Sequence, residues 1–406
     1  MKQKKLDKKM RIVHIVSYFQ PQLGYEEYYV PKYQLSLGHD VFVVTSERYH
    51  PFPHYESIYE EILGSRFSPN IGFHHEEGIP TIRLPIIFEL DSSVGLKHLR
   101  NTMKRLKPDI IHIHGFFFPI VLQTIINTPT SSKIVIDEHM IPPFPYILNI
   151  KNFLKAVYLK VIHKVLFKLY VQKRIHAIYV TKEEVSNYIE KKYNIVAPII
   201  PLGVNTNIFD HSKYNSIALR ENLGFKNDDF LLFYSGKLIR KKGLLTLIRI
   251  YNNLRQEGDN YGLLLIGSGP SKFVDFLKKR IEIQYHDKVK IIPFLNHTIL
   301  PEYMSVGNLG CWIGEIPSAS INEFLGMGKP VLVKVFEGKN LSTNGYNFAL
   351  KYESVKESVN WIQSLANDSD LYQSICDNAR NFAIQNLDWE TTTRMILGIY
   401  NKAKET

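Results

Sequence analysis

Short apolar runs alternate along most of the chain with longer segments of mixed polarity. Many of these runs are apolar at every position, which is typical of strands buried on both faces of a parallel sheet. Several intervening segments repeat apolar residues at helical spacing, as in "GLLTLIRIYNNLRQEG" at 243–258. The alternation predicts an α/β protein with parallel sheets and crossover helices. The predicted strands are residues 11–17, 40–45, 81–84, 109–114, 133–137, 177–180, 197–201, 230–235, 262–267, 289–294, 309–314 and 330–335.

The predicted strands fall into two series, each sufficient for a doubly wound domain. Helical and strand periodicity fails at 201–216, "PLGVNTNIFDHSKYNS", where turn-forming residues gather. A chain of 406 residues is also too long for a single hydrophobic core. We therefore expect one domain over 1–205 and a second over 206–387. Asp388 has a residue type suited to a helix N-cap, and the last segment, 388–406, is predicted to be a helix.

Composition narrows the class of protein. Cys311 and Cys376 are the only cysteines, which excludes a disulfide framework or a cysteine-built metal site and favours a reducing cytosol. The basic start precedes an apolar run too short for a signal peptide, and polar residues interrupt the longest apolar run, 110–126. A soluble, cytoplasmic protein is expected. The net charge of +11 indicates an anionic partner: nucleic acid, an acidic membrane surface or a phosphorylated substrate.

Residues suited to binding phosphate follow two of the predicted strands. The segment "GKLIRKKG" begins with Gly236 and Lys237 and ends with Lys242, just before a predicted helix at 243. One strand later, "GSGP" from Gly267 repeats the order of strand, glycine turn and helix. Ligands of open α/β sheets bind at the carboxyl ends of strands, where backbone amides and helix amino ends favour anions. Two such turns could hold a pyrophosphate, although either could also be a solvated basic loop.

Two glutamates, Glu315 and Glu323, lie eight positions apart in "GEIPSASINEFLGMGKPVLV". Glu315 follows a predicted strand and Glu323 enters the next helix, so both could face the same side as the lysines. Carboxylates accept hydrogen bonds from sugar hydroxyls, and the intervening turn could present backbone N–H groups to an oxygen. The alternative is one helix-capping glutamate and one incidental glutamate.

These residues resemble the retaining, nucleotide-sugar-dependent glycosyltransferases of family 4 (group 1), which have the two-domain GT-B fold. The resemblance is collinear over nearly the whole chain and includes "KPDIIHIHG", "IPLGVNTNIF", "GKLIRKKGLLTLI" and the E-x7-E pair. It implies two Rossmann-like domains facing across a cleft, with residues 388–406 returning to the first. It also implies transfer of a hexose from a nucleoside-diphosphate sugar to a hydroxyl of a glycan or lipid-linked acceptor, in cell-surface polysaccharide or glycolipid biosynthesis.

The resemblance also implies roles for individual residues. Lys242 matches the lysine that binds the donor phosphate, and Lys237 stands where the family usually has arginine. Glu323 is similar to the ribose-binding glutamate, and Glu315 to the one that contacts the transferred sugar. Ala319 and Ser320 match the turn that supplies backbone amides. Gly24 matches the loop close to the diphosphate, and His139 matches the histidine near the reacting sugar.

The implied chemistry requires no cofactor and no metal, because lysines can neutralise the leaving diphosphate. His112 and His114 point to the same side of a predicted strand, which raises the alternative of a zinc site, but no third ligand is evident from the sequence. Packing at the end of the strand, or contact with the acceptor, is the preferred interpretation. His139, Glu315 and Lys242 are the expected catalytic residues.

Positive charge without any acidic residue is concentrated at 151–182, which includes the segment 151–174. Residues 139–182 contain eight Lys or Arg and no Asp or Glu, and the lysines of 151–168 recur every four or five positions among apolar residues. Such a helix suits the surface of an anionic membrane, at the inner face of the cell membrane, although a core helix with a solvated lysine face has the same pattern. No recognised motif supports binding to nucleic acid.

Two other classes of protein compete with the sugar transferase. A Rossmann dehydrogenase is disfavoured because "SYFQPQLGYEE" after the first strand holds one glycine instead of G-x-G-x-x-G. A catalytically weak or inactive homologue, acting as a sugar-nucleotide-binding partner subunit, is the stronger alternative. Its support is the turn "IPSAS" at 316–320, which replaces the aromatic-glycine step usual in the family.

Overall fold

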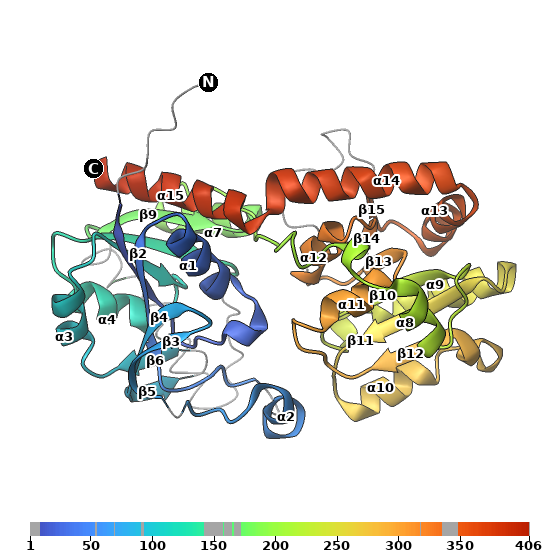
Figure 1. Ribbon diagram of the computed structural model, residues 1–406, viewed down its shortest axis with the longest axis horizontal. Coiled ribbons are helices and arrows are strands. Elements are labelled where there is room, and N and C mark those ends of the chain that lie inside the picture. The colour runs from blue at the N-terminus through green and yellow to red at the C-terminus, as the bar shows by residue number, and fades with distance from the viewer. Residues whose placement is uncertain are drawn as a thin grey trace. The chain divides into compact units, whose positions relative to one another are not determined.

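A computed structural model describes residues 9–52, 55–68, 70–90, 93–141, 157, 165, 172–316, 318–334 and 348–405. Contacts divide the chain into two compact units (Figure 1). The first comprises Met1–Pro201 together with Thr392–Thr406, and the second comprises Leu202–Thr391. Each unit is an α/β domain built on a mainly parallel sheet, as the alternating pattern predicts.

The first unit contains a seven-stranded sheet in the order β3-β4-β2-β1-β7-β8-β9. The strands are β1 (Arg11–Ile15), β2 (Asp40–Ser46), β3 (Gly72–Glu76), β4 (Ile79–Leu84), β7 (Ile110–His114), β8 (Lys133–Glu138) and β9 (Ile175–Val180). All neighbours pair in parallel except β3 and β4. A separate hairpin joins β5 (Ile86–Leu90) to β6 (Ser93–Leu96). The central strands β1, β7 and β8 are buried over nearly their whole length, as expected for strands covered on both faces.

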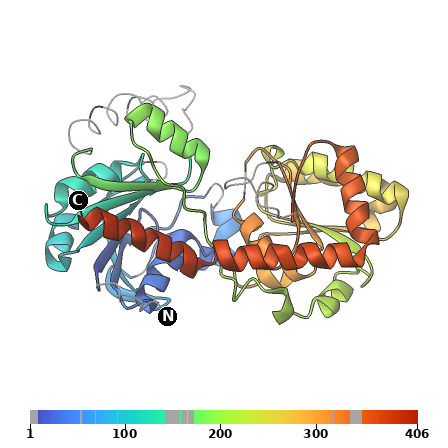
Figure 2. The ribbon, with the colours of Figure 1, turned by 90° about the horizontal axis from the view of Figure 1, so that it is seen from above.

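Helices of the first unit follow the strands. They are α1 (Glu26–Ser36), α2 (Glu60–Leu63), α3 (Leu99–Leu106), α4 (Pro119–Asn127), α7 (Glu183–Tyr193) and α15 (Trp389–Glu405). The carboxyl-terminal part of α15 packs in this unit, as the resemblance implies (Figure 2). Its Ile396, Leu397 and Tyr400 are buried there. The N–H of Glu390 donates to Asp388 Oδ1 over 2.8 Å, so Asp388 is the predicted helix cap.

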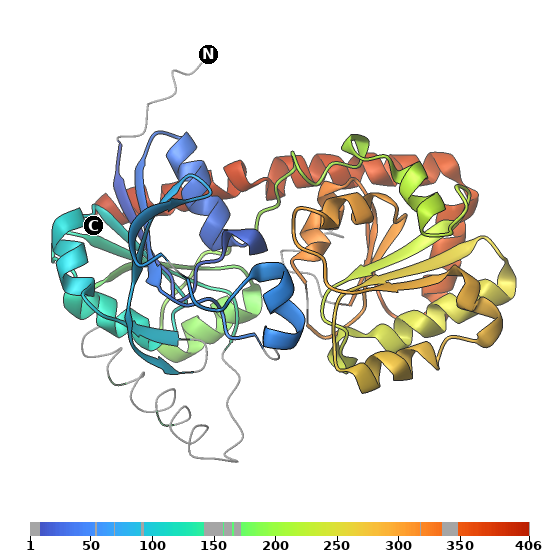
Figure 3. The same ribbon diagram turned by 60° about the horizontal axis from the view of Figure 1, so that its bottom comes forward.

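The second unit contains a six-stranded, entirely parallel sheet in the order β12-β11-β10-β13-β14-β15, with helices on both faces (Figure 3). The strands are β10 (Phe230–Ser235), β11 (Tyr261–Ile266), β12 (Val289–Ile292), β13 (Leu309–Trp312), β14 (Val331–Val333) and β15 (Ala349–Lys351). The helices are α8 (Ser216–Asn222), α9 (Leu244–Glu257), α10 (Ser271–Lys278), α11 (Leu300–Ser305), α12 (Ser320–Gly326), α13 (Val355–Asn367) and α14 (Ser369–Phe382).

The prediction of a strand at 197–201 is wrong. Only an isolated bridge between Val180 and Ile199 occurs there. Pro198 and Pro201 lack the N–H groups that a sheet ladder needs, which explains why the pairing does not extend. The sequence pattern also missed β3, β5, β6 and β15, which are short and lie outside the buried centre of either sheet.

Candidate functional site

Three loops of the second unit meet at the carboxyl edge of its sheet. Strands β11, β10 and β13 are consecutive neighbours and run in parallel, so the segments that follow them emerge side by side. Gly236 follows β10, Gly267 follows β11, and Glu315 comes shortly after β13. The predicted phosphate-binding turns and the E-x7-E segment therefore share one edge of the sheet.

The first two loops pack against each other through backbone. Gly267 has φ +148°, and a Cβ placed on it would lie 1.8 Å from the carbonyl oxygen of Gly236. The N–H of Leu238 donates to the carbonyl oxygen of Ser268 over 3.0 Å, which joins the loops a second time. Only glycine permits this close approach.

The loop that follows β10, residues 236–243, also packs against the segment that carries Glu315. A Cβ on Gly314 would lie 2.5 Å from Lys242 Cα, and the N–H of Glu315 donates to the carbonyl oxygen of Lys241 over 3.1 Å. Lys242 Nζ donates to the carbonyl oxygen of Ile316 over 3.2 Å. Glu315 and Lys237 have exposed side chains, and Lys242 is half-buried. This unit thus brings the predicted lysines and the first glutamate into one neighbourhood.

Glu323 lies in the first turn of α12, which begins directly after Ala319. Ala319 is exposed, Ser320 is half-buried, and the carbonyl oxygen of Ala319 accepts from the N–H groups of Asn322 and Glu323. Glu323 Oε1 lies 2.9 Å from His297 Nε2, and both side chains are mostly buried. His297 was missed from the sequence. Its position in the sequence could have indicated it. His297 lies between β12 and α11, and β12 is the neighbour of β11, so the segment after β12 emerges at the same edge of the sheet.

A second polar group lies in the first unit around His139, which directly follows β8. His139 Nε2 lies 3.3 Å from Glu26 Oε2 and 3.6 Å from Asp137 Oδ1. The His139 side chain is 28% exposed, whereas both carboxylates are buried. The nearby Glu26 and Asp137 carboxylates outweigh the effect of burial and raise the pKa of His139 to about 10. Burial raises the pKa of Glu26 to about 7.

Gly24 joins this group through the helix that follows it. It has φ +63° and ends the short 3-10 turn Pro21–Leu23, and α1 begins two residues later at Glu26. The turn therefore delivers the Glu26 carboxylate to His139. Tyr179 on β9 donates to Glu26 Oε1 over 2.5 Å and fixes this carboxylate from the other side. Neither Glu26 nor Tyr179 was predicted from the sequence.

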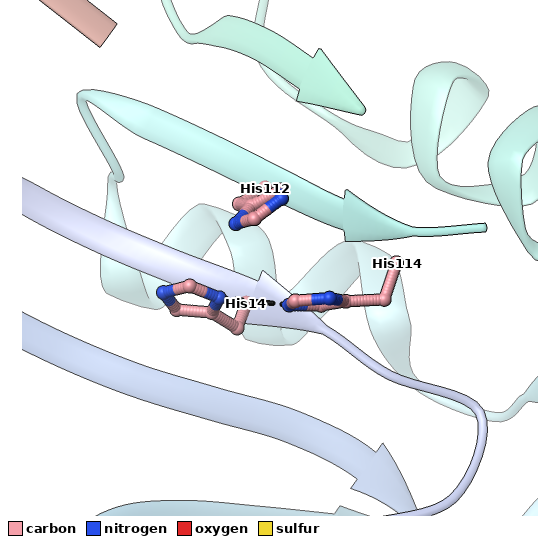
Figure 4. Close-up of side chains that lie close together, drawn as sticks. All are labelled: His14, His112 and His114. Atoms are coloured by element: carbon pink, nitrogen blue, oxygen red, sulfur yellow. Dashed lines mark hydrogen bonds between the residues drawn. The ribbon is translucent and has the colours of Figure 1, made fainter. Parts of the chain in front are cut away.

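Asp137 lies close to His112 and His114. These two histidines form a buried cluster with His14 (Figure 4). The sequence did not reveal the third histidine, because His14 reaches His112 only through the pairing of β1 with β7. One nitrogen of each ring lies within 4.8 Å of the others, a spacing at which histidines can bind a metal ion. All three rings already have polar protein partners: His114 Nε2 and Gln34 for His14, Tyr400 and Tyr179 for His112, and Asp137 for His114. These contacts fit a hydrogen-bonded cluster.

Two predictions concern residues that the structure does not describe. The membrane-facing segment 151–174 lies outside the described residues, apart from 157, 165 and 172–174. Pro317 of the turn between the glutamates is also outside them. None of the described helices has the length and apolar content needed to cross a membrane.

Both halves of the chain match models of glycosyltransferases. Residues 28–208 match the model described as Glycosyltransferase Family 4, and residues 215–382 match the one described as Glycosyl transferases group 1. Together with the two parallel-sheet units, these matches define the class: the chain belongs to the family 4 (group 1) glycosyltransferases of GT-B fold. It is therefore a transferase.

Relatives and solved structures agree with this class. The alpha-monoglucosyldiacylglycerol synthase of Acholeplasma laidlawii is 25% identical over 329 residues, which cover 75% of this chain and 76% of the relative. A glycosyltransferase from Rickettsia africae has a similar fold, with a TM-score of 0.71, 17% identity and coverage of 98% and 99% of the two chains. HepE of Anabaena in complex with UDP and glucose has a TM-score of 0.65, 16% identity and coverage of 97% and 99%.

Proposed function

We propose that this protein is a retaining glycosyltransferase that moves a hexose from a nucleoside-diphosphate sugar to a hydroxyl of a glycan or lipid-linked acceptor. The observation that carries the proposal is the shared edge of the second unit, where the loops bearing Gly236, Gly267 and Glu315 converge beside α12. Ammonium groups and carboxylates in one neighbourhood suit a ligand that has both a diphosphate and hydroxyls.

In this proposal the residues act by binding and charge stabilisation. Lys237 and Lys242 neutralise the departing diphosphate without a metal ion, Glu323 accepts from ribose hydroxyls, and Glu315 accepts from hydroxyls of the sugar. The bond from the anomeric carbon to the phosphate oxygen breaks as the acceptor oxygen bonds to that carbon on the same face. The acceptor proton passes to the departing phosphate, so no covalent enzyme intermediate is required. His139 orients the sugar.

The ligands and activities of similar proteins suggest which donor and acceptor to test first. HepE binds UDP and glucose, and the Acholeplasma laidlawii relative is a monoglucosyldiacylglycerol synthase, so UDP-glucose and a diacylglycerol are the first substrates to test. A lipid acceptor also suits the basic, apolar sequence at 151–174. This assignment is compatible with a cytoplasmic enzyme at the inner face of the membrane.

Calorimetry with UDP-glucose tests the site, with guanosine and adenosine diphosphate glucose as the alternative donors. Glu323→Ala and Lys242→Ala are each expected to weaken donor binding about tenfold to a hundredfold, because each removes a charge-assisted hydrogen bond worth about 1.5–3 kcal/mol. Glu257→Ala and Lys278→Ala are matched controls, since these exposed residues end α9 and α10 at the opposite edge of the sheet.

Unchanged affinity in both site variants would contradict the proposed donor site. Donor binding and product formation are then measured separately, with radiolabelled sugar and extracted lipid or glycan acceptors. Binding of the donor without hydrolysis or transfer, over the whole acceptor series, would instead favour the sugar-nucleotide-binding partner subunit.

A further inference from the structure

The Asp137 carboxylate lies among a backbone N–H and three histidine nitrogens at the carboxyl end of β8. Its Oδ1 accepts from the N–H of Gly115 over 3.0 Å and faces His139 Nε2. Its Oδ2 lies 2.5 Å from His114 Nδ1 and 3.2 Å from His112 Nε2. The side chain has no exposed surface. A carboxylate buried in this way is stable only when cations and hydrogen bonds compensate its charge.

The contacts around Tyr400 determine where His112 carries its proton. Gln34 Nε2 donates to the hydroxyl of Tyr400 over 3.2 Å, so that hydroxyl gives its own proton to His112 Nδ1, 2.7 Å away. His112 therefore accepts at Nδ1 and carries its proton at Nε2, the nitrogen that faces Asp137. Burial lowers the pKa of His112 to about 4, in agreement with a neutral ring.

The same argument assigns the protons of the other two rings. Gln34 Oε1 accepts from His14 Nε2 over 2.8 Å, which leaves His14 Nδ1 to accept from His114 Nε2 over 2.9 Å. His114 Nδ1 faces a carboxylate and carries a proton as well. His114 is therefore an imidazolium paired with Asp137. The opposite orientation of the Gln34 amide would reverse these donors, leaving His114 neutral and placing the imidazolium on His112, whose pKa burial lowers to about 4.

We propose that Asp137 is a positioning residue for sugar transfer: it keeps His139 protonated and fixed in orientation, while the buried histidine cluster and Tyr400 keep Asp137 ionised. The proposal rests on the role of His139 in the proposed function. It makes His139 a cationic hydrogen-bond donor toward the sugar or the leaving phosphate, and excludes it as a general base near neutral pH.

Several charged groups face His139 from the elements packed around it. Glu26 and Glu27 lie on α1, Asp137 lies on β8, and all three favour the imidazolium. His114 on β7 carries the opposite sign, but its charge is matched by the Asp137 contact at Oδ2. Glu138 lies next to His139 in sequence, but its oxygens accept from the backbone N–H groups of Phe116, His139 and Met140.

Nuclear magnetic resonance of the full chain with 13C-labelled histidine tests the proposal without any substrate. The His139 signal is identified by its loss in His139→Gln, and its titration is followed from pH 5 to pH 10.5. We expect a wild-type midpoint well above pH 8, because the Glu26 and Asp137 carboxylates raise the pKa of His139 to about 10. Asp137→Asn is expected to lower the midpoint by about 1–3 pH units.

Glu138→Gln is the matched control, because it removes the same charge one residue away without losing an imidazole contact. Its His139 midpoint is expected to stay near the wild-type value. A wild-type midpoint near the ordinary histidine value of about 6.5 would overturn the proposal, even if Asp137→Asn does not fold. An unchanged midpoint in folded Asp137→Asn, or an equal fall in Glu138→Gln, would also overturn it.

Activity supplies a second readout that a purely structural role would not change. Wild-type kcat is expected to stay level from pH 7 to pH 9, whereas kcat of Asp137→Asn falls over that range as His139 loses its proton, by about twofold if the midpoint is lowered by about 1 pH unit from about 10 and by about tenfold if it is lowered by about 2 units. A parallel pH profile in the two proteins counts against the proposal. If no donor or acceptor supports transfer, the proposed function fails, whereas the titration still decides whether Asp137 sets the protonation of His139.

Discussion

At the scale of single residues, the approach of Gly267 to Gly236 is the tightest feature of the candidate donor site. Gly267→Ala would place a methyl group 1.8 Å from the Gly236 carbonyl oxygen, at a φ that side chains rarely adopt. The backbone of one loop must move, so we expect the free energy of unfolding to fall by about 1–3 kcal/mol. Donor affinity is expected to fall more than tenfold, as measured by calorimetry.

Gly398→Ala is the matched control for that substitution. Gly398 is an exposed glycine inside α15, and a Cβ on it would meet nothing within 4 Å. Alanine in a helix interior is favoured over glycine by about 1 kcal/mol, so this variant should be slightly more stable and bind the donor as wild type does. Equal donor affinity in the two variants would show that the close approach of Gly236 and Gly267 is not needed for binding.

The residues of the site differ in how far sequence alone could place them. Gly236, Lys242, Gly267 and Glu315 follow buried apolar strands, and the ends of parallel strands meet at one edge, so the pattern suffices to group them. His297 could not be paired with Glu323, because its contact depends on where the loop after β12 folds back. The link of His14 to His112 depends on the register between β1 and β7, segments almost a hundred residues apart.

At the scale of elements, Asp388 joins the last helix to the chain that enters the second unit. Its Oδ1 accepts from the N–H of Glu390 over 2.8 Å, and its Oδ2 accepts from the hydroxyl of Thr206 over 2.5 Å. Asp388→Ala removes both contacts, so we expect the free energy of unfolding to fall by about 1 kcal/mol, as measured in urea. Asp388→Asn should retain most of this stability.

Asp377→Ala provides the comparison for Asp388→Ala. Asp377 is exposed on α14 and accepts from Gln373 within the same helix, over 2.9 Å. Its loss should change the free energy of unfolding by less than about 0.5 kcal/mol. If Asp388→Ala is no more destabilising than Asp377→Ala, the cap does not hold the start of α15.

The elements themselves were predictable where burial dominates. Most strands in the centre of either sheet read as mainly apolar runs, because helices cover both faces. The edge strand β3, "GFHHE", alternates half-buried and exposed positions and carries polar residues, so no apolar run marks it. The strand predicted at 197–201 is wrong for the opposite reason. The segment is apolar enough for a strand, but its prolines cannot continue the hydrogen-bond ladder.

At the scale of the whole molecule, each unit has a large hydrophobic core of its own among the described residues. One core gathers residues between Val13 and Ala197, and the other gathers residues between Val204 and Leu387. Tyr400, from the end of the chain, completes the first unit through His112 and Gln34. Because each core lies within one unit, scanning calorimetry should resolve two transitions, of which a nucleoside diphosphate raises only that of the second unit.

The substitution Tyr400→Phe tests which of the two unfolding transitions belongs to the first unit. It leaves His112 Nδ1 and Gln34 Nε2 buried without the hydroxyl they now contact, a loss of about 1–3 kcal/mol. The transition that does not respond to UDP should therefore fall by about 2–12 °C, at about 2–4 °C per kcal/mol for a domain of this size. Tyr188→Phe is the control, because its half-buried hydroxyl accepts from Lys192 in the next turn of the same helix and its loss should change little. A fall in the UDP-responsive transition of Tyr400→Phe would mean that the end of α15 stabilises the second unit instead.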